Sequence, residues 1–552
     1  MQIPDNYQQI IRDWHIIGKN GIFTLGVKYD NRKVLFTIVP DYLKFVFQVK
    51  KSMKDAGVED QDIIKIISLI QNNYIEFYPD IHLLEENETQ TNHSTKTEIL
   101  DISDEQWQLE LTSKLNTLKE VSDRNFPGIW PAIKFTLSIR NILKIDKISL
   151  PFAGIILGAP SSTKTLGLEL LKGTPSTYYT DSFTPRAFVS HNTAVSEEKL
   201  LQIDLIPKIK NKLFMTPELG PMFSSKDEEL IQNVGIFTRV LDGQGYESDT
   251  GAFGHRGYNE EIMFVWVGAA VEIPKKIYKY LATLGPKLYF YRIKIKKESE
   301  EELLKTLKQD NFSERKEELK KSLLDYISWF DRYPHSKSDV KTKLTKIEWD
   351  PSKDDETALR FIIKLGNLLA PLRGSAVAYE TKNTQSSDYA YSIPTIEIPT
   401  RAITCLKHLA KGHALLEGRN YIGIEDIPIV IQTVMSTAPA ERVMVFDLLL
   451  NMKGEAASLE IETYLNISRP TTLKTMTELR ILGLVDVVKQ SEAENAPQSI
   501  KLKKEYEWVL GKQFKILKEG TISEIRMEFG QHPVHNDKSQ QSSTPIPDEN
   551  EQ

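Results

Sequence analysis

Residues 148–165 decide the fold, and they read Ile148-Ser-Leu-Pro-Phe-Ala-Gly-Ile-Ile-Leu157 followed by Gly158-Ala-Pro-Ser-Ser-Thr-Lys164-Thr165. The apolar run that ends at Leu157 is typical of a buried strand in a parallel sheet. A helical pattern, Leu166-Gly-Leu-Glu-Leu-Leu171, begins directly after the loop. Because further short strands alternate with helices up to about residue 295, the sequence predicts an α/β domain built on a parallel sheet.

The loop between this strand and this helix has the composition of a phosphate-binding loop. In such loops consecutive backbone N–H groups point into one concavity, a lysine reaches the β- and γ-phosphates, and a hydroxyl holds Mg²⁺. We assign the last two roles to Lys164 and Thr165. The other members of the predicted nucleotide-binding loop are Gly158, Ala159, Pro160, Ser161, Ser162 and Thr163.

Thr163 departs from the usual pattern, which has a second glycine directly before the lysine. Backbone conformation is the reason for glycine at that position. A Ser/Thr-rich helix cap, with Lys164 merely exposed, is therefore an alternative interpretation. The strand before the loop, the helix after it and an acidic strand about fifty residues further on favour the phosphate site.

The acidic strand reads Lys212-Leu-Phe-Met-Thr-Pro-Glu218. Its end resembles that of nucleotide hydrolases, in which one carboxylate orders Mg²⁺ and the next orients the attacking water. Glu218 matches the second role, as a base or water-orienting group, and Pro217 stands at the metal-side position. We expect Thr216 or Asp204 to complete the Mg²⁺ site. An acidic helix start is the alternative interpretation of Glu218.

Composition limits the classes of function. The chain has 552 residues, 40% hydrophobic and 26% charged, as in globular proteins of several domains. Its net charge of −6 allows a local basic patch but excludes a nucleic-acid coat over the whole surface. The single cysteine, Cys405, excludes an internal disulfide and a thiolate metal cluster. We find no secretion signal and no apolar run near the roughly 20 residues that cross a bilayer, so we expect a cytoplasmic protein without a membrane partner.

Changes in composition and periodicity divide the chain into seven segments. The first is expected to hold strands at 21–28 and 33–39 and a helix near 60–75. The segments are a small N-terminal α+β module (1–83), a linker (84–100), the phosphate-loop α/β domain (101–295), a charged helical insertion expected to be solvated (296–354), a helical lid (355–440), a further compact unit (441–518) and a mostly disordered tail (519–552).

Over residues 150–440 the order of parts resembles that of the AAA+ ATPases. The similarity is to the branch with the minichromosome maintenance helicases and the sigma-54 transcription activators, in which a helix and a hairpin follow the acidic strand. Gly235-Ile-Phe-Thr-Arg-Val-Leu-Asp-Gly-Gln-Gly-Tyr246 matches that insert. The resemblance implies ATP and Mg²⁺ as cofactors, DNA as a partner, and self-association into a ring, expected to be a hexamer. His255 and Arg256 at the hairpin tip would touch the DNA, whereas a glycine-rich structural turn is the alternative.

The same resemblance assigns four cations to the nucleotide. Residues 284–292 resemble the stretch that carries the finger presented to a neighbouring subunit's nucleotide, with Lys287 the better match and Arg292 the alternative. Arg401, at the start of a lid helix, matches the arginine that reaches back to the nucleotide, and Arg373 is a second candidate for nucleotide contact. Ordinary ion pairs are the alternative for each of the four.

The segment after the lid resembles a winged helix-turn-helix. Ser468 caps a predicted helix with Pro470 in its first turn. In a major groove this helix would present Arg469, Thr471, Thr472 and Lys474 to DNA, with Thr475 nearby and Lys489 and the stretch 501–504 on phosphates. A protein-interaction version of the module is the alternative.

These features lead to one principal hypothesis and two alternatives. The principal hypothesis is an ATP-hydrolysing AAA+ protein that works on DNA as a helicase- or translocase-like motor. The first alternative is an ATP-controlled DNA-binding regulator with weak or no hydrolysis. It is favoured by Pro217 and by the sensor strand, Met263–Glu272, in which Ala269 and Ala270 stand where the family has a polar residue and Glu272 is the nearest polar side chain. An inactive scaffold is the second alternative.

Overall fold

The structure is a computed structural model that describes most of residues 103–530 and, nearer the N-terminus, three strands and the residues Met53 and Lys54. The chain divides into two compact units, Met1–Asp101 and Ile102–Gln552. The expected linker at 84–100 and most of the expected tail, 531–552, lie outside the described residues. Between 103 and 530 the description leaves out 161, 175, 191–196, 251–253, 295–298, 302–303, 305–307, 309–310, 334–335, 339–344, 377, 381–388 and 490–497.

The first unit contains an antiparallel sheet. β1 (Ile11–Lys19), β2 (Ile22–Tyr29) and β3 (Arg32–Thr37) pair in the order β1-β2-β3. β2 and β3 coincide with the two strands expected from alternation, and β1 is an additional one. The helix expected near 60–75 lies outside the described residues.

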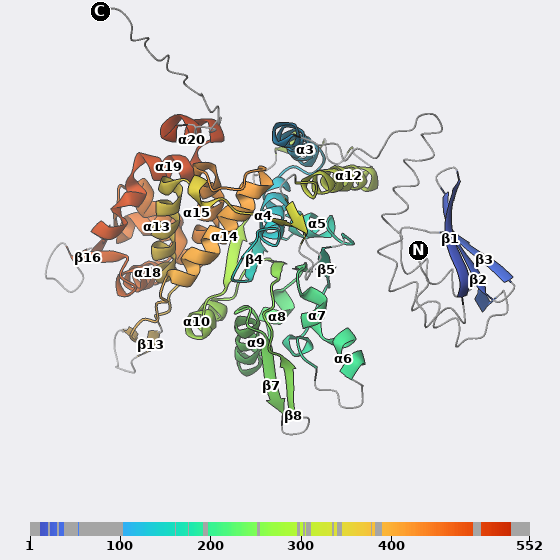
Figure 1. The fold of residues 1–552 in the computed structure, drawn as a ribbon. Coiled ribbons are helices and arrows are strands. Elements are labelled where there is room, and N and C mark those ends of the chain that lie inside the picture. The colour runs from blue at the N-terminus through green and yellow to red at the C-terminus, as the bar shows by residue number, and fades with distance from the viewer. Residues whose placement is uncertain are drawn as a thin grey trace, which may run out of the picture. The chain divides into compact units, whose positions relative to one another are not determined.

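A five-stranded parallel sheet forms the centre of the second unit (Figure 1). Its order, β10-β4-β9-β6-β5, places β4, the strand before the phosphate loop, between two neighbours. The predicted parallel sheet is confirmed, and the mixed α/β arrangement is consistent with a P-loop NTPase. The strands are β4 (Phe152–Leu157), β5 (Thr177–Tyr179), β6 (Leu213–Thr216), β9 (Val265–Ala270) and β10 (Leu288–Arg292).

The register of the sheet fixes two functional edges. Leu157, the last residue of β4, lies opposite both Ala270 and Arg292, which end β9 and β10. Chain segments that leave these strands therefore meet at one edge, which we call the carboxyl edge. The edge at which the strands begin is called the amino edge. The six residues of β4 separate the two edges by roughly 16–20 Å, so a side chain at one edge does not reach a loop at the other.

Alternating side chains of β4 serve two cores, one on each face of the sheet. Phe152 and Ile156 belong to the first core, and Ala153, Ile155 and Leu157 to the second. The first core includes residues of α3 (Asp104–Asn125), α4 (Trp130–Ile142), α12 (Phe312–Phe330), α13 (Glu356–Leu372), α14 (Thr400–Leu416) and α15 (Ile427–Ser436). The second includes residues of α7 (Leu205–Ile209), α8 (Gly220–Phe223), α9 (Asp227–Val240) and α10 (Lys275–Leu284).

The charged segment 296–354 differs from the expected solvated insertion. Its main helix, α12, buries one apolar stripe that includes Leu319, Leu323, Tyr326 and Phe330. These residues recur every three to four positions, so they lie on one side of the helix and join the first core while the charged residues stay outside.

A compact set of helices and a small sheet follows α15. β15, β17 and β16 form an antiparallel sheet in the order β15-β17-β16. Ordered structure continues past residue 519, where the tail was expected to begin, because Thr521 and Glu524 form a capping box and Ile525 is buried. The elements are α16 (Ala440–Asn451), β15 (Glu455–Ala457), α17 (Ser458–Leu465), α18 (Arg469–Ile481), β16 (Val485–Lys489), β17 (Gln498–Leu502), η5 (Lys504–Leu510), α19 (Lys512–Glu519) and α20 (Ile522–Phe529).

Shorter elements complete the described chain. The hairpin β7–β8 extends away from the sheet at the bottom of Figure 1. Within the described residues, no helix combines the length and apolar character needed to span a bilayer. These elements are α5 (Lys164–Glu169), η2 (Pro185–Ala187), α6 (Glu197–Ile203), β7 (Tyr246–Thr250), β8 (Gly254–Tyr258), β11 (Ser336–Ser338), β12 (Thr345–Ile347), η3 (Pro351–Lys353), β13 (Ala378–Glu380), β14 (Tyr389–Tyr391) and η4 (Ile424–Asp426).

Candidate nucleotide-binding site

The predicted phosphate loop leaves β4 at Leu157 and enters α5 at Lys164. Its first residue is fixed to the sheet, because the N–H of Gly158 donates to the carbonyl of Ala270 at 3.3 Å. A Cβ on Gly158 would lie only 2.6 Å from Oγ of Ser162. The loop therefore folds back over its own start, and a Cβ at residue 158 would force the Ser162 side chain to move.

Thr163 adopts the backbone conformation that glycine supplies in the usual pattern. Its φ of +59° lies in the left-handed region, which costs a non-glycine residue on the order of 1–2 kcal/mol. Its hydroxyl donates to the carbonyl of Ser162 at 2.6 Å, and its own carbonyl accepts from the N–H of Gly167 at 3.0 Å. The substituted loop thus keeps the turn that the second glycine would make.

Lys164 lies inside the loop rather than on the surface. Its side chain is buried, and its Nζ donates to the carbonyl of Ala159 at 3.1 Å. Burial lowers the pKa of Lys164, and the negative charge of Glu218 partly offsets this effect. Among the described residues, the buried Oγ of Ser162 has no hydrogen-bond partner. A loop that holds both a buried ammonium and an unsatisfied hydroxyl suits an anionic, hydrogen-bonding ligand such as a phosphate group.

Glu218 follows β6 at the carboxyl edge, on the same side of the sheet as the loop. Its Oε1 accepts from the N–H of Gly220 at 2.8 Å. The N–H of Leu219 donates to the carbonyl of Ala269 at 2.9 Å, which fixes the segment against β9. Glu218 also lines a pocket of about 590 Å³ that extends to the segment 181–186 and to α8 and α9.

The two groups expected to complete a Mg²⁺ site are already engaged elsewhere. Thr216 is fully buried, and its Oγ1 accepts from the indole N–H of Trp266 at 2.8 Å. Asp204 is also fully buried and accepts from Arg256 Nη2 at 2.6 Å and from the hydroxyl of Tyr258 at 2.8 Å. Thr165, half-buried at the start of α5, is the metal candidate that lies in the loop itself.

Arg292 lies at the carboxyl edge and forms a forked pair with Glu272. Its two terminal nitrogens each lie 2.8 Å from one carboxylate oxygen of Glu272. This bond raises the pKa of Arg292. The pair ends β10 and follows β9, so Arg292 stands beside its own phosphate loop, where a finger for a neighbouring subunit would not be expected.

Lys287 and Arg401 lie at the opposite, amino edge. Lys287 precedes β10, and its Nζ donates to Asp242 Oδ1 at 2.5 Å and to the carbonyl of Thr238 at 2.6 Å. Arg401 donates to the same Asp242 oxygen at 3.1 Å and to the carbonyl of Leu241 at 2.6 Å. Neither cation faces the chain's own loop. The expected reach of Arg401 back to its own nucleotide is thus not the arrangement found.

Arg373 ends α13 as its C-cap and is buried. Its Nε donates to Glu397 Oε1 at 2.5 Å, and its Cζ lies 5.1 Å from the ring centroid of Tyr289. Tyr289 is the second residue of β10, so Arg373 also lies toward the amino edge. The structure therefore separates the predicted nucleotide contacts into a loop group and a cation group.

The hairpin residues expected to meet DNA carry acidic partners. Arg256 points inward to buried Asp204, and His255 lies between Asp249 and Glu247, at 3.2 and 3.3 Å. Hydrogen bonds to Asp249 and Glu247 raise the pKa of His255. Two carboxylates on an exposed hairpin oppose a polyanion, so these contacts give the predicted DNA role of His255 and Arg256 no support.

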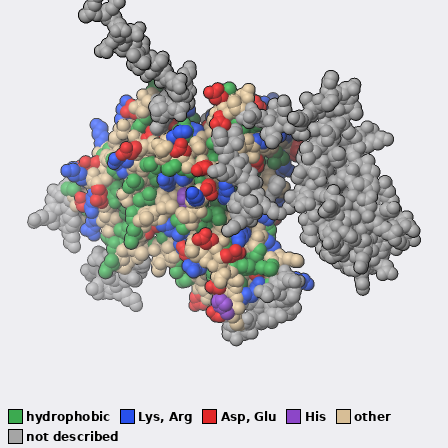
Figure 2. Space-filling model, viewed as in Figure 1, with side chains coloured by type: hydrophobic (Ala, Val, Ile, Leu, Met, Phe, Trp, Pro, Cys, Tyr) green, Lys and Arg blue, Asp and Glu red, His purple; other side chains and the backbone are tan. Residues whose placement is uncertain are grey.

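Helix α18 presents only part of its predicted DNA-contacting set. Arg469 and Lys474 are exposed and Thr471 is half-buried. The expectation that Thr472 is exposed is corrected, since it is fully buried and its Oγ1 bonds the carbonyl of Ser468 at 3.2 Å. Thr475 is buried as well. On the face shown in Figure 2, basic and acidic side chains are interspersed.

Sequence reasoning missed Asp242, and it considered Asp204 only for the Mg²⁺ site, not as the partner of the hairpin. Asp242 links Lys287 to Arg401, and Asp204 links the hairpin to the domain. One usable signal was the alternation in β8, because Arg256 and Tyr258 are two residues apart and so share a face. Asp242 had no comparable signal, since its partners lie far away in the sequence.

No family model matches the sequence, and no curated protein matches it at a significant level. Among solved structures it is similar to "SCCmec type IV Cch - active helicase", with 10% identity, a TM-score of 0.30, and coverage of 91% of this chain and 95% of that one. The ORC1 protein of Aeropyrum pernix in complex with DNA follows at 14% identity, TM-score 0.19, and coverage of 71% and 88%. The C-terminal region of NrS-1 is similar at 9% identity and a TM-score of 0.18, with coverage of 89% of this chain and 97% of that one. Because these TM-scores are low, the functional argument rests on the geometry of the site.

Proposed function

We propose that this chain is an ATPase of the AAA+ type that binds ATP in the loop Gly158–Thr165 and works on DNA as a helicase- or translocase-like motor. The observation that carries the proposal is that one loop, at the carboxyl end of β4, holds both the buried ammonium of Lys164 and the buried hydroxyl of Ser162, which has no hydrogen-bond partner among the described residues. These groups form an incomplete cluster that the phosphates of a nucleotide would complete.

Each loop group has a distinct task in this proposal. Lys164 leaves the carbonyl of Ala159 and binds the β- and γ-phosphates, while Ser162 and the first N–H groups of α5 donate to phosphate oxygens. The hydroxyl of Thr165 would hold a Mg²⁺ ion, which supplies charge neutralisation at the phosphates. Glu218, on the same edge, orients the water that attacks the γ-phosphate.

We further propose that Lys287 and Arg401 serve the nucleotide of a neighbouring copy. Both lie at the amino edge, roughly the length of β4 away from their own loop. A cation that stabilises transition-state charge must reach the phosphates, and these two can do so only if another chain's carboxyl edge faces them. A head-to-tail ring, which we expect to be a hexamer, satisfies this condition.

DNA contact is assigned to the C-terminal unit, which we propose to be a winged helix. The order α16, β15, α17, α18, β16, β17 with its three-stranded antiparallel sheet fits that module. Arg469 and Lys474 are exposed cations in the first half of α18. They contact phosphates or base edges in the proposal, whereas Thr472 packs inside.

Nucleotide binding by the full chain and by two variants tests the central claim. Lys164→Ala should weaken binding of a fluorescent ATP analogue by at least about tenfold, because a charge-assisted contact of about 1.5–3 kcal/mol is lost. Lys172→Ala removes an exposed lysine a few residues away and should bind like the unaltered chain. Equal affinity of all three proteins would refute the loop as the nucleotide site.

An ATP-controlled DNA-binding regulator is the second candidate function. Ala269 and Ala270 give the end of β9 no polar group near the loop, and Glu218 follows Pro217 instead of an aspartate. Phosphate release measured with and without single- and double-stranded DNA separates the two functions. A motor hydrolyses ATP faster with DNA, and a regulator binds ATP and DNA with little turnover.

A further inference from the structure

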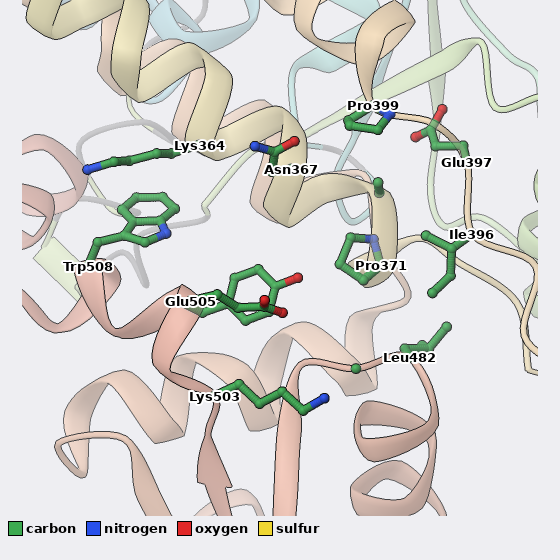
Figure 3. A pocket seen from close by; sticks show the side chains of 13 residues that line it. Lys364, Asn367, Pro371, Ile396, Glu397, Pro399, Leu482, Lys503, Glu505 and Trp508 are labelled. Atoms are coloured by element: carbon green, nitrogen blue, oxygen red, sulfur yellow. The ribbon is translucent and has the colours of Figure 1, made fainter.

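A groove of about 520 Å³ lies where α13 meets the C-terminal unit (Figure 3). We call it the C-terminal groove. Four segments form its walls: the second half of α13, residues 396–399, the turn Leu482–Gly483 after α18, and the segment Lys503–Trp508 that includes most of η5. Its walls include Pro371, Ile396, Leu482, Tyr506 and Trp508. It belongs to none of the loop or cation groups assigned above.

The groove combines aromatic and apolar walls with two lysines. In Figure 3, Lys364 and Trp508 lie at one end, Pro371, Ile396 and Leu482 at the other, and Lys503 below. The Nζ of Lys364 lies 5.6 Å from the ring centroid of Trp508. Among the contacts of the described residues, neither Lys364 nor Lys503 pairs with a carboxylate. The groove therefore suits an extended apolar segment that carries negative charge.

Apolar side chains also stand exposed along the wall before α14. Ile393 is 91% exposed and Ile398 is 80% exposed, on either side of the groove residue Ile396. Several exposed large apolar residues beside a groove indicate a surface that binds another segment. Extended proline-containing segments bind such aromatic-lined grooves, because their conformation is already restricted before binding.

The last described helix ends close to this groove. The ring of Phe529, at the end of α20, lies 6.2 Å from that of Phe361, which in turn lies 6.2 Å from that of Trp508. Lys364 follows Phe361 by one turn of α13. The chain therefore leaves Gly530 beside the Lys364 end. Residues 531–544 can span up to about 46 Å, far more than the width of the groove.

The sequence beyond residue 543 has the matching chemistry. It reads Thr544-Pro545-Ile546-Pro547-Asp548-Glu549-Asn550-Glu551, an apolar proline-flanked centre followed by three carboxylates. We propose that residues 544–551 of the same chain bind in the C-terminal groove, with Pro545–Pro547 against Trp508 and Tyr506 and the acidic residues toward Lys364 and Lys503. Glu397 in the wall is held by Arg373, so it competes little for these lysines.

A nucleic acid strand is the competing occupant, since aromatic rings and lysines also bind single strands. Glu505 in the wall opposes negative charge on either occupant, so this carboxylate does not separate the two. The own-chain segment meets the groove with carboxylates that can turn to the two lysines. It also has the high local concentration of a tethered ligand, which a separate strand lacks.

Tryptophan quenching of a fluorophore tests the proposal in the full chain. A bimane label on the Asn550→Cys variant should be quenched by Trp508, and Trp508→Phe should restore most of the emission while keeping an aromatic ring in place. Cys405 is buried, so the unaltered chain serves as the labelling control. Trp349→Phe removes a different tryptophan and should leave the quenching unchanged.

Further outcomes decide between the occupants. Pro545→Ala with Pro547→Ala should reduce the quenching in the otherwise unaltered chain, and circular dichroism should show the same folded content. Emission that is identical with and without Trp508 would overturn the proposal. So would quenching that rises with protein concentration, which assigns the groove to a second copy, or an oligonucleotide affinity that falls in Trp508→Phe without any quenching. The measurement needs no nucleotide, so it stands apart from the ATPase assignment.

Discussion

Lys287 and Arg401 bind the same carboxylate oxygen, Oδ1 of Asp242, at 2.5 and 3.1 Å. Lys287 directly precedes β10, and Arg401 lies in the first turn of α14. Burial lowers the pKa of Lys287, and Asp242 partly offsets this effect. Two cations on one carboxylate leave an excess of positive charge at the amino edge, which suits a phosphate-bearing partner.

A mixing experiment tests whether the two edges act on one nucleotide. Lys164→Ala and Lys287→Ala chains should each hydrolyse ATP poorly, because one lacks the loop lysine and the other the amino-edge cation. A mixture should recover a substantial part of the activity, since Lys287 of the first variant can serve the intact loop of the second. Phosphate release across a range of mixing ratios measures this. A strictly additive result would mean that each chain uses its own Lys287.

The tight turn of the phosphate loop predicts that the effects of replacing Gly158 and Ser162 are coupled. Gly158→Ala should weaken nucleotide binding, because its Cβ would meet Ser162 Oγ at 2.6 Å. Ser162 is also a proposed phosphate donor, so the comparison is made in the Ser162→Ala background, where that oxygen is gone and Gly158→Ala should weaken binding less than it does in the unaltered chain. Titration with a fluorescent ATP analogue gives the affinities of the unaltered chain, the two single variants and the double variant. An equal loss on Gly158→Ala in both backgrounds would contradict this geometry.

His408 predicts a loss of stability in mild acid. Burial, the first cause, and the nearby Lys411 and Lys407 lower the pKa of His408 to about 4. Between about pH 6.5 and pH 4, His408 takes up a proton in the unfolded chain but not in the folded chain. The free energy of unfolding therefore falls as the pH is lowered through this range. The loss in the free energy of unfolding from pH 7 to pH 4 is on the order of 3 kcal/mol.

Urea unfolding of the unaltered chain and of His408→Gln between pH 7 and 4 measures this effect. The unaltered chain should lose more stability over that range than the variant does. His255→Gln is the matched control, because the pKa of His255 is raised and its removal should not flatten the acid loss. Parallel curves for the unaltered chain and His408→Gln would contradict the prediction.

DNA binding should depend on α18 and not on the hairpin. Arg469→Ala and Lys474→Ala should each lower affinity and reduce the slope of log affinity against log salt by about one, as expected for a lost phosphate contact. Arg256→Ala removes a cation already paired with Asp204 and should leave that slope unchanged. Fluorescence anisotropy at several salt concentrations decides this, and a slope that changes only with Arg256→Ala would reverse the assignment.

The central sheet and its loop could be predicted because their signals are local. The apolar run to Leu157 and the next eight residues contain the strand, the turn and the lysine, and the sheet is found where they place it. The conformation of Thr163 could not be predicted. The usual pattern has glycine at this position, and the sequence did not show that threonine would adopt a positive φ there. Helix α20 (Ile522–Phe529) lies in the first part of the segment expected to be a mostly disordered tail, and its eight residues are too few to show a helical period in the sequence.

Positions of charged side chains were harder to predict, because their partners are distant in sequence. Arg401 was assigned to the nucleotide from its place at a helix start, and no sequence signal indicated that Asp242 holds it at the amino edge of the sheet. The exposed side of α18 was also misjudged. Thr471 and Thr472 are neighbours, and a helix turns about 100° between them, so the packing of α18 against the elements around it decides which one is buried.

The direction of the parallel sheet gives this protein a front and a back. If the loop at the carboxyl edge is completed by cations from another copy's amino edge, two chains related by a twofold axis cannot complete both sites through one shared surface. An open row of copies then always has one uncompleted loop at one end and one unused set of cations at the other. Closing the row removes both ends at once, so the copy that closes the ring completes two sites. Each copy added to an open row completes only one. The protein concentration at which ATPase activity appears should therefore be set by ring closure. Activity should rise steeply around that concentration.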